Sequence, residues 1–237
     1  MNKRLLLLSN STNPGEAYLS WPMPYIKDFL GKPKKILFIP YAGVSISYED
    51  YFTAVAGQMT TLGHEVTGIH QIETDVGFLN KFDAIAIGGG NTFRLADLLQ
   101  GHHLIETLRE AVENGMPYFG WSAGSNIACP TIKTTNDMPI VEPRSFNGLN
   151  LIPFQINPHY TEATIPNHGG ESREMRLKEF TMVNQDTHVA CLPEGSFLRL
   201  EGQVLTFGGG GECKVFKHKK SPVLYAPGED LSWLMRH

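Results

Sequence analysis

The sequence predicts an α/β fold with a mostly parallel central sheet, helices on both of its faces, and antiparallel hairpins near the C-terminus. In the first half of the chain, short apolar runs alternate with segments of helical periodicity, which is the pattern of parallel strands covered on both faces. Near the end of the chain, apolar segments are separated by glycine-containing turns, which is typical of hairpins. No internal repeat or linker divides the 237 residues, so we expect one domain over residues 1–237.

Each strand expected in the first half is a short apolar run, and each helix carries apolar residues at helical spacing, such as Tyr51, Val55 and Met59. Gly115 is placed to end the last of these helices. The expected strands are residues 4–9, 35–40, 65–69, 83–87 and 117–119, and the expected helices are residues 23–30, 47–62 and 104–114.

Beyond residue 130 the pattern is less regular. Residues 131–141 are extended and polar, and residues 170–183 have a helical pattern. Residues 151–156 and 188–192 are strand-like, and glycines interrupt residues 196–216 in the manner of antiparallel hairpins.

Composition and charge narrow the function classes. The chain is 41% hydrophobic and 19% charged with a formal net charge of −4, so we expect no nucleic-acid partner. Its three cysteines are widely spaced and include no CxxC pair, which favours a reducing compartment and no zinc site. The apolar run at residues 5–8 is too short for a signal peptide or a membrane span. We therefore expect a cytoplasmic protein without a membrane partner.

The segment Gly120-Trp121-Ser122-Ala123-Gly124 matches the GxSxG pattern of a nucleophile elbow. An apolar strand precedes it and a small-residue turn follows it, which is the context that the motif requires. The flanking glycines lack side chains that would clash in so tight a turn. Ser122 is therefore the candidate nucleophile.

A serine hydroxyl needs a base to remove its proton, and that base needs an acid to orient it. His159 follows an expected strand and lies where strand ends converge, although a purely structural role is open. His168 is the other loop candidate. Glu194, just past residues 188–192, is the favoured acid. Asp137, in a polar loop, is either a supporting or substrate-facing group or the side chain of an Asx turn.

An oxyanion site requires backbone N–H groups aimed at the developing charge. The turn Gly88-Gly89-Gly90 offers such groups, so we expect Gly89 or Gly90 to act together with Ala123. A phosphate cradle is the rival interpretation, but the turn lacks both the P-loop lysine and the GxGxxG spacing. The order serine, histidine, acid also differs from that of the α/β-hydrolases.

Several long stretches of the chain resemble the peptidase E family of α-aspartyl dipeptidases, serine peptidases with a fold similar to class I glutamine amidotransferases. The matching stretches span most of the chain: LLLLSNST (5–12), GGGNTF (88–93), GWSAGSN (120–126), CPTIKTTNDMPIV (129–141), QINPHYT (155–161), GESREMR (170–176) and LPEG (192–195).

The resemblance implies Ser122 as nucleophile, His159 as general base and Glu194 as its partner, and it places Asp137 in a functional motif. It also implies cleavage of dipeptides that begin with aspartate, with no metal or organic cofactor. Amidotransferases place cysteine at the elbow and glutamate two residues after the histidine. Here those positions hold Ser122 and Thr161, so glutamine hydrolysis is not expected.

An aspartyl substrate needs a cation for its side-chain carboxylate, and an arginine fork would bind it bidentately. Arg173 is the candidate, although it could instead pair with Glu171 or Glu174. Asn91 is a further candidate for substrate binding, and Asp137 could bind the substrate's amino group.

Two other functions stay open at this point. A cyanophycinase-like hydrolase of β-aspartyl peptides would share the elbow and the glycine turn, and a non-catalytic binding relative would share the fold. We expect a small peptide as the substrate, and the sequence does not distinguish a monomer from a homodimer.

Overall fold

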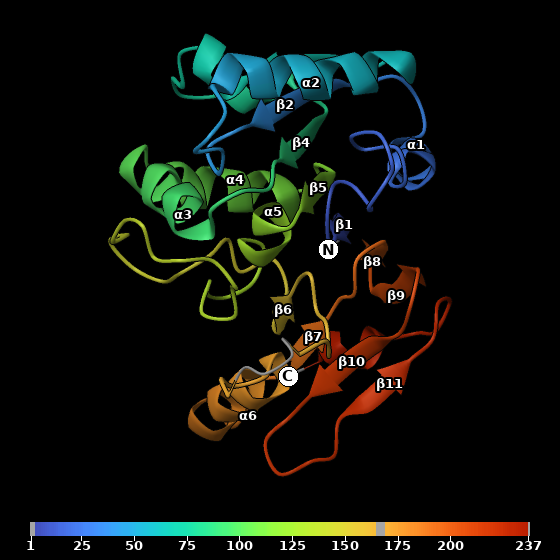
Figure 1. Cartoon of the computed structure of the whole chain (residues 1–237). Helices are drawn as coiled ribbons and strands as arrows, with labels where there is room; N and C mark the ends of the chain where they lie inside the picture. Colours follow the sequence, from blue (N-terminus) through green and yellow to red (C-terminus); the bar gives the residue numbers. More distant parts are fainter. Residues whose placement is uncertain (1–2, 165–168, 237) are drawn as a thin grey trace.

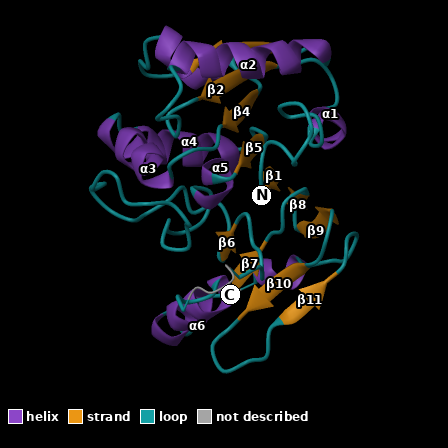
Figure 2. Ribbon diagram, viewed as in Figure 1, coloured by secondary structure: helices purple, strands orange, loops and turns teal. Residues whose placement is uncertain are grey.

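The computed structural model describes residues 3–164 and 169–236 and contains two sheets (Figures 1 and 2). The larger sheet has seven strands in the order β3-β2-β4-β5-β1-β8-β9. The strands from β3 to β1 are parallel, while β8 runs antiparallel to β1 and β9 antiparallel to β8. Their bounds are β1 (Arg4–Leu8), β2 (Lys35–Ile39), β3 (Glu65–Gly68), β4 (Ala84–Ile87), β5 (Tyr118–Trp121), β8 (Ser196–Glu201) and β9 (Val204–Gly209).

The smaller sheet has four strands in the order β11-β10-β7-β6. It comprises β6 (Gln155–Asn157), β7 (Val189–Cys191), β10 (Cys213–Phe216) and β11 (Val223–Tyr225). The expected hairpins over residues 196–216 are therefore only partly present. β8 and β9 form a hairpin, but β10 pairs with β7 and β11. Between β9 and β10 the chain passes from the larger sheet to the smaller one. It turns at Gly209 and Gly211, which have positive φ angles of 91° and 68°.

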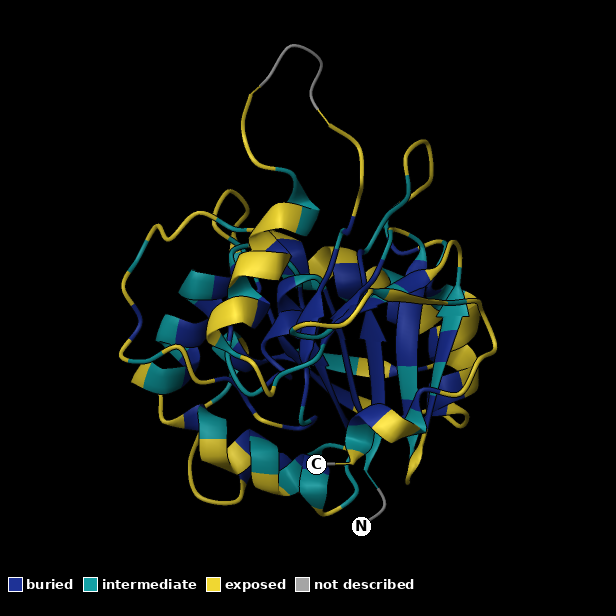
Figure 3. Ribbon diagram, turned by 90° about the horizontal axis from the view of Figure 1, so that it is seen from below, coloured by how far each residue is buried: buried dark blue, intermediate teal, exposed yellow. Residues whose placement is uncertain are grey.

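Helices cover both faces of the larger sheet, as expected, and alternate strand residues face opposite sides. Leu5 and Leu7 of β1 pack toward α3 and α4, whereas Leu6 and Leu8 pack toward α1 and α2. Figure 3 shows these strands buried between the partly exposed helices. The helices are α1 (Met23–Leu30), α2 (Tyr48–Thr61), α3 (Thr92–Gly101), α4 (Leu104–Glu113), α5 (Ala123–Asn126) and α6 (Arg173–Val183), with 3₁₀ turns at Ile69–Gln71, Phe78–Lys81 and Ser232–Met235.

The smaller sheet lies between α6 and the main core. Leu177 of α6 packs on one face with Val189 and Phe216. Ile156 and Ala190, on the opposite face, belong to the buried cluster that also includes the interior of the larger sheet. This packing brings the strand ends of β6 and β7 close to the end of β1. Within the described residues, no helix has the length and apolar character needed to cross a bilayer.

Candidate active site

Ser122 lies in the turn between β5 and α5, at φ 54° and ψ −111°. Such a positive φ is uncommon for a residue with a side chain. The turn is possible because its neighbours are glycines: a Cβ on Gly124 would lie 2.1 Å from the carbonyl oxygen of Ile87, and one on Gly120 would lie 2.7 Å from the backbone of Gly124. Helix α5 therefore sits directly on the sheet and presents the serine at its edge.

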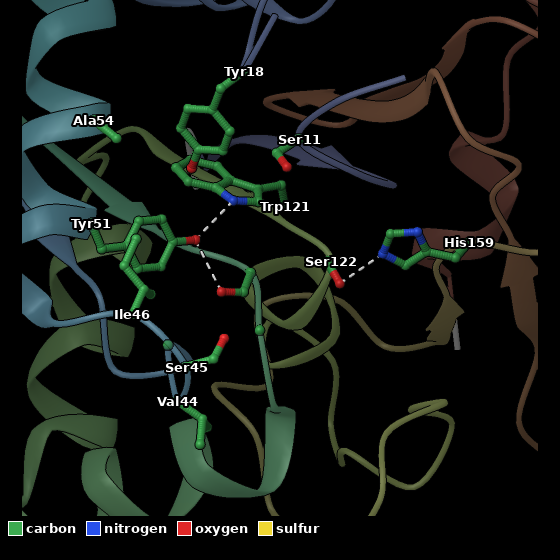
Figure 4. A pocket seen from close by; sticks show the side chains of 13 residues that line it. Ser11, Tyr18, Val44, Ser45, Ile46, Tyr51, Ala54, Trp121, Ser122 and His159 are labelled. Carbon is green, nitrogen blue, oxygen red and sulfur yellow. Dashed lines mark hydrogen bonds between the residues drawn. The ribbon is translucent and has the colours of Figure 1, made fainter. Parts of the chain in front are cut away.

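His159 and Glu194 complete a chain of hydrogen bonds with Ser122. The Nε2 atom of His159 lies 2.9 Å from Ser122 Oγ (Figure 4), and its Nδ1 atom lies 3.1 Å from Oε1 of Glu194. A carboxylate can only accept, so Nδ1 carries the proton and Nε2 accepts from the serine hydroxyl. This is the tautomer in which the imidazole can act as a base toward the serine.

The three residues come from two different sheets. The sequence suggested instead that they lie at the same edge of a single sheet. Ser122 follows β5 of the larger sheet, whereas His159 and Glu194 follow β6 and β7 of the smaller one. The side chains of His159 and Glu194 are 37% and 48% exposed, so the acid lies in contact with solvent. His168, the alternative base, lies outside the described residues.

Asp137 and Asn91 anchor a loop to the start of α3. Asp137 Oδ2 accepts from the Thr92 N–H (2.7 Å), the Thr92 hydroxyl (2.6 Å) and the Thr135 hydroxyl (3.0 Å). Asn91 caps α3 by accepting from the Arg94 N–H, and its amide donates to the Met138 carbonyl. Within the described residues neither side chain is hydrogen-bonded to His159, so the geometry favours Glu194 as the acid that orients the histidine.

The glycine turn after β4 lies against the elbow. A Cβ on Gly89 would lie 3.1 Å from that of Ser122, and Gly90 has a φ of 138°. The Tyr51 hydroxyl donates to the Gly89 carbonyl (2.9 Å) and accepts from Trp121 Nε1 (3.1 Å), as Figure 4 shows. Because the C=O and N–H of a trans peptide point in opposite directions, this bond directs the Gly90 N–H away from Tyr51.

The N–H groups of Gly90 and Ala123 lie near the serine. In the described structure the Gly90 N–H donates to no protein acceptor, and Ala123, as the first residue of α5, has no partner within its helix. Such groups can stabilise an oxyanion. Burial raises the pKa of Tyr51 to about 12, so its hydroxyl keeps its proton at neutral pH. The sequence alone does not indicate that Tyr51 orients the peptide between Gly89 and Gly90, because Tyr51 fits the apolar face of α2 equally well.

A cavity of about 560 Å³ opens beside Ser122 and His159 (Figure 4). No lysine, arginine, aspartate or glutamate is among its lining residues. Its walls are aromatic and aliphatic side chains with a few hydroxyl groups, contributed by Ser11, Tyr18, Val44, Ser45, Ile46, Tyr51, Ala54 and Trp121.

Arg173 lies on the opposite side of His159, at the first position of α6. Its Nη1 donates to the His159 carbonyl (3.2 Å), and burial lowers the pKa of the guanidinium. In the described chain it pairs with neither Glu171 nor Glu174, since Glu171 contacts Arg176 and Glu174 contacts Lys178 and Lys214. Arg173 lines a separate cavity of about 200 Å³, and its bond to the His159 carbonyl places it next to the histidine.

The family model described as Peptidase family S51 matches residues 5–207. The chain belongs to peptidase family S51. Among its S51 relatives, a peptidase E from Nostoc sp. is 50% identical over 236 residues, covering 99% of this chain and 98% of its own. A peptidase E from Escherichia coli O6:K15:H31 is 44% identical over 219 residues, covering 92% and 96%. The expected membership of the peptidase E family is thereby confirmed, and the chain is a serine peptidase.

Solved structures show the same fold for this S51 peptidase. The crystal structure of a peptidase from an acI-B1 Actinobacterium superposes with a TM-score of 0.66 at 19% identity, covering 98% of this chain and 97% of its own. A protein from Listeria monocytogenes EGD-e gives a TM-score of 0.66 at 22% identity, covering 89% and 100%. The expected α/β class, with a mostly parallel sheet and antiparallel strands toward the C-terminus, is confirmed.

Proposed function

We propose that this S51 peptidase hydrolyses dipeptides whose first residue is aspartate, through an acyl-enzyme formed on Ser122. The observation that carries the proposal is the unbroken hydrogen-bond chain from Ser122 through His159 to Glu194, beside a glycine turn whose Gly90 N–H donates to no acceptor among the described residues. Together these supply a nucleophile, a base, an orienting acid and an oxyanion site.

In the acylation step, His159 Nε2 removes the hydroxyl proton as Ser122 Oγ attacks the peptide carbonyl carbon. The N–H groups of Gly90 (or Gly89) and Ala123 hold the negative charge that develops on the carbonyl oxygen. The bond from Nδ1–H to Glu194 stabilises the imidazolium formed in this step. The protonated histidine then donates to the leaving amine, the C–N bond breaks, and the second residue departs.

Deacylation repeats the same chemistry with water. His159 removes a proton from a water molecule, whose oxygen attacks the acyl carbon, and the same N–H groups hold the second oxyanion. Collapse of this intermediate breaks the ester bond to Ser122 Oγ, which regains its proton from His159. Free aspartate leaves, and the site returns to its starting protonation state.

The charges around the site suggest how the substrate lies. We assign its side-chain carboxylate to Arg173, whose bond to the His159 carbonyl uses one of five guanidinium N–H groups. The uncharged cavity then suits the side chain of the second residue. We assign the α-amino group to Asp137, whose Oδ2 holds the loop while Asn91 fixes the neighbouring Met138.

A dipeptide panel tests this proposal. We expect Asp-Leu to be cleaved much faster than Asn-Leu, Glu-Leu or Leu-Leu, in the presence of a chelator as well as without it. Arg173→Ala should lower kcat/KM for Asp-Leu at least about 30-fold, because removing a partner of a shielded charge costs about 2 kcal/mol or more. Arg144→Ala, at an exposed arginine that lines neither the cavity beside Ser122 nor the one that Arg173 lines, is the matched control.

Two outcomes would contradict the proposal. Equal cleavage of Asn-Leu and Asp-Leu would remove the role of Arg173, and full activity in Ser122→Ala would remove the acyl-enzyme. Faster cleavage of a β-aspartyl peptide than of Asp-Leu would instead indicate the cyanophycinase-like reaction.

A further inference from the structure

Ser9 and Asn10 lie at the C-terminal end of β1, where the two sheets meet. Both side chains are buried, with 0% and 2% exposure, although both are polar. Buried polar groups are normally hydrogen-bonded, so their partners indicate what they hold in place. These two residues belong to the LLLLSNST stretch, which the proposed reaction does not use.

Ser9 binds the backbone of both segments that carry the histidine–glutamate pair. Its hydroxyl accepts from the N–H of His159 (2.9 Å) and donates to the carbonyl of Leu192 (2.9 Å). His159 has a φ of 52°, an uncommon conformation for a residue other than glycine. The bond from its N–H to Ser9 stabilises this conformation, which directs the imidazole toward Ser122.

Asn10 binds the other side of Glu194. Its Oδ1 accepts from the N–H of Gly195 (2.8 Å), while its Nδ2 donates to the Thr12 carbonyl (2.8 Å) and to Asn13 Oδ1 (3.0 Å). The contacts of Ser9 at Leu192 and of Asn10 at Gly195 therefore bracket the acid. The carboxylate itself is half-exposed, so these backbone bonds, more than side-chain packing, set its position.

Leu8, the residue before Ser9, holds the loop of the proposed nucleophile in place. The carbonyl of Leu8 accepts from the N–H of Ser122 (3.1 Å) and from the hydroxyl of Ser125 (2.6 Å). Three consecutive residues at the end of β1 thus contact the elbow, the histidine and the loop of the acid: Leu8, Ser9 and Asn10. We propose that Ser9 and Asn10 are positioning residues that fix His159 and Glu194 relative to Ser122. This inference rests on the proposed roles of those three residues.

Ser9→Ala and Asn10→Ala test the inference. A misplacement of about 1 Å can cost about 100-fold in rate, so we expect kcat to fall about 10- to 100-fold with KM changed less than about twofold. Labelling of Ser122 by a fluorophosphonate should slow by a similar factor, because it uses the same base but no peptide-binding group. Ser9→Thr keeps the hydroxyl, so it should recover much of the rate.

Thr181→Ala is the matched control, because Thr181 is also buried and its hydroxyl donates to a backbone carbonyl, that of Lys178 in α6. Thr181→Ala should lower the melting temperature about as much as Ser9→Ala and Asn10→Ala do, but it should leave kcat and the labelling rate unchanged. The inference is overturned if folded Ser9→Ala and Asn10→Ala keep kcat within twofold of the wild type, or if only KM changes. Labelling needs no dipeptide, so wild-type protein that is labelled at Ser122 but cleaves no Asp-Xaa would refute the proposed substrate alone.

Discussion

Hydrogen bonds to its N–H and to its carbonyl hold Ser122 in an uncommon backbone conformation. Its N–H donates to the Leu8 carbonyl, and its own carbonyl accepts from the N–H groups of Ser125 and Asn126. Such conformations cost on the order of 1–3 kcal/mol and persist only where the surroundings fix them. The close contact of Gly124 with the Ile87 carbonyl is part of that fixation, because the helix cannot approach the sheet so closely with a side chain there.

Gly124→Ala should therefore disrupt the elbow. The new methyl group would meet a backbone oxygen of β4, so α5 must move outward and Ser122 with it. We expect kcat to fall at least about 100-fold and the melting temperature to drop. Gly57→Ala, in the middle of α2 with no atom within 4 Å, should keep full activity and gain about 0.5–1 kcal/mol of stability. Similar activities for the two variants would show that the elbow tolerates a shifted helix.

At the scale of elements, the start of α3 shows what the two candidate acids do. Asp137 and Asn91 satisfy backbone N–H groups in the first turn of α3, as capping residues do. Glu194 holds no helix end and contacts His159 instead. The two carboxylates should therefore differ in whether their loss affects stability or catalysis first.

Asp137→Ala should lower the free energy of unfolding by about 1–2 kcal/mol, because it removes a cap and two side-chain hydrogen bonds. Glu194→Gln should leave stability within about 0.5 kcal/mol but lower kcat about 10- to 100-fold, a modest effect because water screens the exposed carboxylate. Urea titrations and steady-state kinetics measure both. Asp97→Ala, which breaks a partly exposed ion pair within α3, is the control for general surface effects. Asp137→Ala also removes the proposed partner of the substrate's amino group, so the acid is tested by fluorophosphonate labelling of Ser122, which needs no such partner. Slower labelling in Asp137→Ala than in Glu194→Gln would reassign the acid.

The sequence predicted the strands of the first half well, because most of them are apolar runs with residues buried on both faces: β1, β2, β4 and β5. It missed α3, although Leu95, Ala96 and Leu99 form its buried face, because the preceding glycine turn was interpreted only for its chemistry. It also predicted one central sheet and did not separate β6 and β7 into a second one. A three-residue apolar strand carries no information about which sheet it joins, since that depends on pairing with distant segments.

The same distinction applies to the site. Ser122 can be proposed from the sequence because the elbow is a local motif. His159 and Glu194 can be proposed because each lies within a few residues of the end of an expected strand, residues 151–156 and 188–192. The roles of Tyr51 and Ser9 depend on contacts across 38 and 150 residues. The local sequence around Tyr51 is equally consistent with an ordinary core residue, and that around Ser9 with an ordinary loop residue.

For the whole molecule, buried histidines link stability to pH. His64 is 3% exposed, and its Nδ1 accepts from the Lys34 N–H (3.1 Å). Burial, and secondarily the charge of Lys34, lowers the pKa of His64, and burial beside Lys217 does the same for His188. The folded state thus favours neutral imidazole, whereas histidines in the unfolded chain bind protons below about pH 6.5. Stability is therefore full above that pH and is lost as the pH falls through the lower folded-state pKa values.

We expect the free energy of unfolding to decrease between about pH 6.5 and pH 5, before most carboxylates titrate. His64→Asn should reduce this slope, because the amide oxygen can still accept from Lys34 but does not titrate. Urea unfolding at a series of pH values measures the effect. His103→Asn, at an exposed position with a φ of 57° that asparagine tolerates, should keep the wild-type slope. An unchanged slope in His64→Asn would contradict this account.

The interior position of β1 also constrains how the enzyme is made. β1 pairs with β5, which ends at Trp121, and with β8, which ends at Glu201. Chains fold as they are synthesised, from the N-terminus onward. β1 must therefore wait for its second partner until residue 201 has been made. A nascent chain that stops before residue 201 lacks this pairing, so we expect the proposed catalytic groups to be held together only after β8 has been synthesised.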